Sequence, residues 1–175
     1  ANIGYTNVSF LTTVIEQLGL PIVIKESFGS FGQQVYLAKT QEEIISIITK
    51  LEGISLLFQE YIEASAGCDV RLQVVGEQVV AAMERKAKQG DFRANVTNGG
   101  SMKNYKPTKK EEQLAIRCCK ILGVDFAGVD LLFDENGEPL VCEVNSNAHF
   151  KNIFECTGIN TADYIIDYII EQVQS

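Results

Sequence analysis

The stretch from residue 126 to residue 145 constrains the fold most, because it reads as two strands joined by a tight turn. Apolar and β-branched residues flank the dipeptide Asn136-Gly137, a strong signal for a two-residue hairpin loop. A hairpin with that loop pairs Asp130 directly with Glu143. The period-2 alternation of a strand then puts Asn145 on the same face as Glu143.

Two opposed carboxylates repel one another unless a cation lies between them or one of them is protonated. Carboxylate and amide oxygens, without thiolate or imidazole, favour magnesium or manganese over zinc. Asp130, Glu143 and Asn145 are therefore the predicted ligands of a hard divalent cation. The alternative is an exposed strand face with incidental acids. The neighbouring apolar residues favour a sheet with one buried face.

The rest of the chain mixes helical patterns with further hairpins. Strands are expected at residues 21–25, 35–38, 56–62, 69–75 and 78–84, and helices at residues 7–18, 40–51, 109–122 and 162–173. Thr40, Thr108 and Thr161 are predicted N-caps, and Glu43 completes a capping box with Thr40. This order predicts an α+β fold in one unit or two small lobes, and not a Rossmann domain.

Composition excludes several classes of protein. The 175 residues are 46% apolar, which suffices for a core, and the net charge of −8 argues against general nucleic-acid binding. No apolar stretch reaches the roughly 20 residues of a membrane span, and no secretion signal is evident, so a cytoplasmic protein is expected. The five cysteines lack metal-type spacing and are expected to be reduced thiols. The chain lacks an initial Met, and a fragment of a longer protein is expected.

Charge is unevenly distributed along the chain. Between Arg85 and Lys110 there are eight basic residues and one acid, Asp91. Either a solvated loop or a segment facing a polyanion explains this run. Lys25 ends an apolar strand before a loop with Gly29 and Gly32, where backbone N–H groups could approach phosphates. A structural turn explains that loop equally well.

Several of these motifs occur together in one known family. The runs PIVIK, QEYI, GDFRANV, AGVDLL and CEVN, in this order and spacing, resemble RimK-type α-L-glutamate ligases of the ATP-grasp superfamily. The resemblance extends from about residue 22 to the end. It implies an α+β ATP-grasp fold with antiparallel sheets in two subdomains, residues 1–62 and 63–175, with the nucleotide held between them. From the resemblance we also expect that the domain which precedes this region in the family is missing from the sequence.

The resemblance also implies roles for individual residues. ATP would be bound by residues of both subdomains: Lys25, Gly29, Gly32, Glu60, Tyr61, Asp69, Arg93, Ala94 and Asn95. Arg93, Arg71 and Arg85 would serve catalysis as cations near the phosphates and the reacting carboxylate. Asp130, Glu143 and Asn145 would bind Mg²⁺ or Mn²⁺, in agreement with the hairpin argument.

The implied reaction joins a carboxylate to an amine through an acyl phosphate, with amino-acid or peptide substrates and a protein acceptor as an open choice. Neither nucleic acid nor membrane is an expected partner, and a homo-oligomer is left open. Other ATP-grasp ligases of amino-acid or cofactor biosynthesis, a phosphotransferase and a non-catalytic ATP-binding module are the alternatives. Residues 146–150 (SNAHF) depart from the small residue, proline and glycine of many relatives, so the acceptor and the role of His149 stay open.

Overall fold

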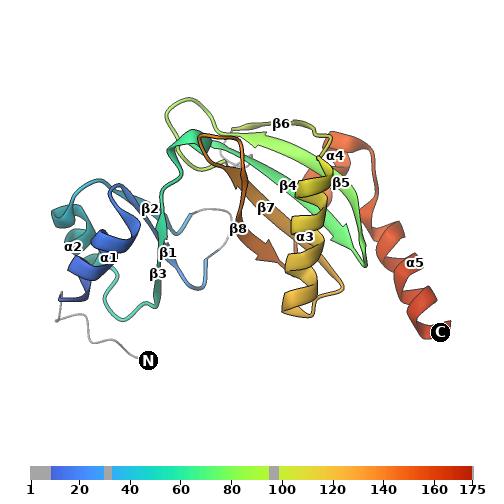
Figure 1. Ribbon diagram of the computed structural model, residues 1–175, viewed down its shortest axis with the longest axis horizontal. Coiled ribbons are helices and arrows are strands. Elements are labelled where there is room, and N and C mark those ends of the chain that lie inside the picture. The colour runs from blue at the N-terminus through green and yellow to red at the C-terminus, as the bar shows by residue number, and fades with distance from the viewer. Residues whose placement is uncertain (1–8, 30–32, 95–98, 175) are drawn as a thin grey trace. The chain divides into compact units, whose positions relative to one another are not determined.

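The computed structural model describes residues 9–29, 33–94 and 99–174 (Figure 1). The chain divides into two compact units, Ala1–Tyr61 and Ile62–Ser175. Each unit has its own antiparallel sheet, three-stranded in the first and five-stranded in the second. The mixture of helices and antiparallel hairpins confirms the predicted α+β class. Within the described residues, none of the helices combines the length and apolar character required to span a bilayer.

The first unit packs two helices on a sheet with the strand order β2-β1-β3. Its elements are α1 (Phe10–Leu18), β1 (Ile22–Glu26), β2 (Val35–Ala38), α2 (Gln41–Lys50) and β3 (Leu56–Glu60). Ile22 and Ile24 alternate along β1 towards the helices and are fully buried with Leu11 and Ile44. This alternation is the pattern expected of a strand with one core face.

The start of α2 is capped by Thr40, whose hydroxyl accepts the Glu43 N–H at 3.3 Å. The Glu43 carboxylate, however, accepts the N–H of Lys39 at 2.6 Å, one residue before the cap. The predicted capping box is therefore only half formed at this helix. The full box occurs instead at α3 (Lys109–Leu122), between Thr108 and Glu111.

The second unit has the strand order β6-β5-β4-β7-β8. Its strands are β4 (Cys68–Val75), β5 (Gln78–Lys86), β6 (Ser101–Asn104), β7 (Phe126–Phe133) and β8 (Pro139–Asn145). One face of this sheet is apolar, with Val70, Leu72 and Val129 packed around Ala115 and Cys119 of α3. The other face is covered in part, where Ile153 packs on Ala81 and Met83, and its remaining side chains can form a site.

The β7–β8 hairpin differs from the prediction at its turn. The Asp134 N–H donates to the Glu138 carbonyl at 3.1 Å, so residues 135–137 form a three-residue loop, with Gly137 at a φ of 77°. The two-residue turn was wrong, and near the loop the register is displaced by one residue. A bulge at Cys142 restores it, since Leu131 pairs with Val141 but Asp130 pairs with Glu143. The predicted pairing of Asp130 with Glu143 is thus confirmed, but it depends on a bulge that sequence reasoning missed.

Some elements were not predicted. They are β6, a short 3₁₀ turn at Glu63–Ser65, and α4 (Lys151–Thr157), which precedes α5 (Thr161–Gln174). Thr161 is the first residue of α5 and not its cap, because Asn160 accepts the Ala162 N–H. All five cysteines are free, as expected, although only Cys119 is fully buried.

Leu72→Ala tests the packing of α3 on the second sheet. Leu72 is 0% exposed, so its truncation should lower the free energy of unfolding by about 2–5 kcal/mol. The measurement is urea denaturation followed by circular dichroism. Ile121→Ala is the control, because Ile121 is 72% exposed and its loss should change stability by less than about 0.5 kcal/mol. Equal effects of the two variants would contradict this core assignment.

Candidate functional site

Six of the predicted site residues lie on the sheet face opposite α3. Cross-strand pairing joins Asp69 to Arg85, Arg71 to Asp130, and Asp130 to Glu143. Paired residues, and residues two apart on one strand, point to the same face. The set is Asp69 and Arg71 of β4, Arg85 of β5, Asp130 of β7, and Glu143 and Asn145 of β8. The structure therefore brings together residues that are far apart in the sequence.

Asp130 lies between two guanidinium groups. Arg71 donates from Nε to Oδ1 of Asp130 at 2.7 Å and from Nη2 to Oδ2 at 2.6 Å. Nη2 of Arg85 lies 2.9 Å from the same Oδ2. Arg85 also makes a bidentate pair with Asp69, with both distances 2.6 Å. Two acids and two arginines thus form a neutral, largely buried network that holds both guanidinium planes in place.

The two acids of this network, Asp130 and Asp69, differ in pKa because their surroundings differ. Burial alone would raise the pKa of Asp130, but Arg71 and Arg85 outweigh it and hold that pKa below its usual range. At Asp69, burial prevails over the attraction of Arg85 and raises the pKa to about 6. For Arg85, burial acts to lower the pKa, while Asp130 and Asp69 raise it above its ordinary value. Asp130 is therefore an anion at neutral pH, and Asp69 takes up a proton in mild acid.

This network changes the argument for a metal. The repulsion between Asp130 and Glu143 does not by itself require a bound cation, because Arg71 and Arg85 already neutralise Asp130. In the described residues, no three or more His, Cys, Asp and Glu side chains gather as a metal-binding group. The candidate ligand set contains two carboxylates and one amide. The metal assignment consequently rests on the oxygen chemistry of that set.

The three predicted ligands nevertheless fit a hard divalent cation. The Asn145 side-chain N–H donates to Oε1 of Glu143 at 2.9 Å, so these two groups already lie side by side. A carboxylate oxygen can accept from more than one direction, so the bond from Arg71 leaves Oδ1 of Asp130 able to bind a metal. Oxygen ligands of this kind suit magnesium or manganese. Glu143 is exposed, which gives the set an open side.

The predicted residues of the first unit lie on two strands. Lys25 in β1 pairs with Val35 and Leu57, whereas Glu60 pairs with Ile22 near the other end of β1. Tyr61 follows the end of β3. The phosphate and adenine roles of these residues stay predictions.

Packing within its own loop explains why residue 29 is a glycine. A Cβ on Gly29 would lie 3.0 Å from Cβ of Gln34, so the returning chain passes too close for most side chains. This contact supports the structural-turn alternative for the loop, without testing a phosphate role. Gly32 lies outside the described residues.

Arg93 is held by Asp91. Its Nε and Nη2 donate to the two carboxylate oxygens at 2.9 and 3.0 Å, and its backbone N–H donates to Oδ1 at 3.0 Å. Hydrogen bonding from Arg93 lowers the pKa of Asp91. The Gly67 N–H donates to the Phe92 carbonyl at 2.8 Å, which ties this loop to the start of β4. Ala94 follows Arg93, and Asn95 lies outside the described residues.

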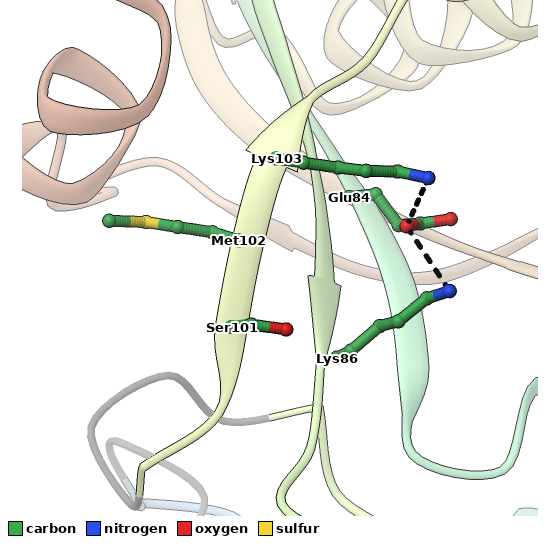
Figure 2. Close-up of a pocket in the computed structure, with 5 residues that line it drawn as sticks. All are labelled: Glu84, Lys86, Ser101, Met102 and Lys103. Atoms are coloured by element: carbon green, nitrogen blue, oxygen red, sulfur yellow. Dashed lines mark ion pairs between the residues drawn. The ribbon is translucent and has the colours of Figure 1, made fainter.

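The basic run between residues 85 and 110 has many acidic partners within the chain. With partners among the described residues, five of its eight cations form ion pairs: Arg85 with Asp69, Lys86 and Lys103 with Glu84, Arg93 with Asp91, and Lys110 with Glu138. Figure 2 shows Lys86 and Lys103 converging on the Glu84 carboxylate, at 3.5 and 2.9 Å. Glu84 points away from the Arg85 face, because neighbouring strand residues alternate. Sequence reasoning missed this acid.

Comparison with known proteins decides the family. Residues 5–169 match the RimK-like ATP-grasp domain. The chain belongs to this family. It is 41% identical over 158 residues to the "Probable alpha-L-glutamate ligase" of Maridesulfovibrio salexigens, covering 89% of the chain and 52% of that protein. It is 42% identical over 153 residues to the ribosomal protein bS6–L-glutamate ligase of Escherichia coli O81, covering 86% and 51%. The chain thus spans about half the length of these curated relatives.

Solved structures confirm the ATP-grasp fold. The ligase PsnB, complexed with a minimal precursor, Mg and ADP, matches with a TM-score of 0.74 at 18% identity, covering 97% of this chain and 51% of PsnB. The D-alanine–D-alanine ligase of Bacillus anthracis, complexed with ATP, matches with a TM-score of 0.66 at 19% identity, covering 90% and 53%. At such low identities the similarity concerns the fold alone.

The pKa of Asp69 in this ATP-grasp chain gives a pH prediction. Its carboxyl should titrate at about pH 6 in ¹³C NMR. The Asp130 carboxyl should instead titrate below the pKa that is usual for an aspartate. Because the folded pKa of Asp69 exceeds the unfolded value of 3.8, its protonation stabilises the fold below pH 4, and this contribution is lost as pH rises through 6. Asp69→Asn should remove this dependence of the free energy of unfolding on pH. A titration of Asp69 below pH 4 would contradict the expectation.

Proposed function

We propose that this chain binds ATP with a divalent cation and, in the complete gene product, joins a carboxylate to an amine through an acyl phosphate. The observation that carries the proposal is the sheet face on which Asp130, Glu143 and Asn145 lie beside two fixed arginines. Support comes from the names of the relatives, which are glutamate ligases, and from the titles of fold neighbours solved with ATP, or with Mg and ADP.

The proposed chemistry requires positioning and charge neutralisation and no protein nucleophile. Asp130, Glu143 and Asn145 would hold magnesium or manganese, which neutralises phosphate oxygens during transfer. Lys25 and Arg93 would bind phosphate oxygens, and Glu60 and Tyr61 the adenine. Asp69 would lie near the ribose, with Gly29, Gly32, Ala94 and Asn95 completing the nucleotide contacts.

Arg71 and Arg85 would orient the reacting carboxylate. Their planes are set by Asp130 and Asp69, so the N–H groups that point away from these acids have fixed directions. A guanidinium that is already oriented loses little side-chain entropy on binding an anion. This preorganisation favours a carboxylate or an acyl phosphate as the group they bind.

The substrates follow from the relatives. We propose glutamate, or another amino acid, joined to a protein or peptide acceptor, because two curated relatives are named as glutamate ligases and one of these names specifies ribosomal protein bS6. The attacking amine and the activated carboxylate would both be small polar groups presented to the charged face.

The direct test is ADP release by the complete gene product with ATP and Mg²⁺, across amino acids paired with peptide acceptors. We expect release that depends on both the amine and the carboxylate, with an amide product seen by mass spectrometry. A stable phosphorylated product formed without amine would indicate a phosphotransferase. Nucleotide binding without turnover in any pairing would indicate a non-catalytic module.

Glu143→Gln tests the metal assignment with the least disturbance of the fold. Asp130 is less suitable, because its loss would leave the largely buried Arg71 without its carboxylate partner and cost about 3–5 kcal/mol. Glu143 is exposed, so Gln should leave stability unchanged while it lowers the turnover number at least about tenfold and raises the magnesium concentration required, as expected for a lost metal ligand. Glu135→Gln, in the exposed β7–β8 loop, is the control. Normal magnesium dependence of Glu143→Gln would refute the assignment.

A further inference from the structure

Gln73 carries a buried amide oxygen that no donor in the described part of the chain reaches. The residue lies in β4 and is 2% exposed. Among the residues that the structure describes, none donates a hydrogen bond to its Oε1. A buried acceptor without a partner lowers stability, and such groups often belong to a functional site.

The position of Gln73 connects it to the charged face. It lies two residues along β4 from Arg71, so both side chains project from the same face. Gln73 pairs with Gly128 of β7, and Gly128 pairs with Asn145 of β8. The row Gln73–Gly128–Asn145 therefore runs beside the row Arg71–Asp130–Glu143. The lone acceptor is part of the same face as the proposed metal ligands.

Gly128 leaves a space between Gln73 and Asn145 that another segment fills. A Cβ on Gly128 would lie 2.7 Å from Cβ of Ala148 and 3.5 Å from Cδ and Nε of Arg71. The chain after β8 thus lies directly over this row, and the Ala148 methyl group takes the place of a side chain. A substrate group of similar size could occupy that place if the segment 146–150 moved outward.

We propose that Gln73 Oε1 binds the amino group of the amine substrate, in the place that Ala148 takes in this structure. This inference rests on the proposed function. An ammonium or amine has N–H donors, which match an amide oxygen, while the arginines on the same face match the carboxylate. A neutral acceptor also suits the reaction. A carboxylate there would stabilise the ammonium form, which must lose a proton before it can attack. Gln73 holds the amine and takes no proton from it.

Gln73→Met is the test variant, because methionine has a similar volume and lacks the oxygen. In the complete gene product, KM for the amine should rise about tenfold, the effect of losing one hydrogen bond of about 1.4 kcal/mol. KM for ATP and kcat at saturating amine should stay unchanged. The midpoint of urea denaturation should stay the same or rise, since the removed oxygen has no partner in the described structure.

Two further variants control for other effects. Gln78→Met changes an exposed glutamine of β5 and should leave all constants unchanged. Gln73→Glu keeps an oxygen acceptor, so KM for the amine should stay near the wild-type value.

The outcomes separate this inference from the proposed function. An active wild-type protein with an unchanged amine KM in Gln73→Met overturns this inference alone. A Gln73→Met protein that is less stable or fails to fold also overturns it, because the amide would then have a structural role. Absence of amine-dependent ADP release in the wild-type protein overturns the proposed function, and this inference with it.

Discussion

The charged face of the second sheet depends on Asp130, which is 3% exposed and lies between Arg71 and Arg85. An isolated carboxylate at such a position would be protonated or would destabilise the fold. The two arginines keep it ionised, and Asp130 in turn fixes their planes. Asp69 completes the neutral network by sharing Arg85. The protein's own acids thus orient both guanidinium groups before any ligand arrives, as the proposed site for anionic substrates requires.

Because side chains alternate along each strand, the two faces of the second sheet have different roles. Leu72 and Val70 point to α3 and form the core, while Asp69, Arg71 and Gln73 point the other way from the same strand. In β5, Glu84 and Arg85 are adjacent in sequence but belong to different charge clusters. Ile153 of α4 packs on Ala81 and Met83 of the charged face, so an apolar patch lies on the strand that carries Arg85. The core face and the charged face therefore use the same strands, although Ile153 adds an apolar patch to the charged face on β5.

The segment after β8 lies next to the proposed metal ligands. Gly128 has room for the Ala148 methyl group, and this close approach brings Ala148 over the row that contains Gln73 and Asn145. A larger residue at position 128 would push the segment away. His149 in the same stretch is exposed.

Although the two-residue turn from which the Asp130–Glu143 pairing was predicted was wrong, the sequence by itself determined the α+β class, most strand and helix positions and the cap at Thr108. These features depend on local periodicity, capping and turn residues, which act over a few positions. Only the tertiary structure decided that Arg71 would neutralise Asp130, 59 residues away, and that the bulge at Cys142 would offset the longer hairpin loop. It also decided that Gln73 would lie buried beside Gly128. Such features arise from the pairing of strands distant in sequence, and residue patterns within one strand do not specify which strand will lie beside it.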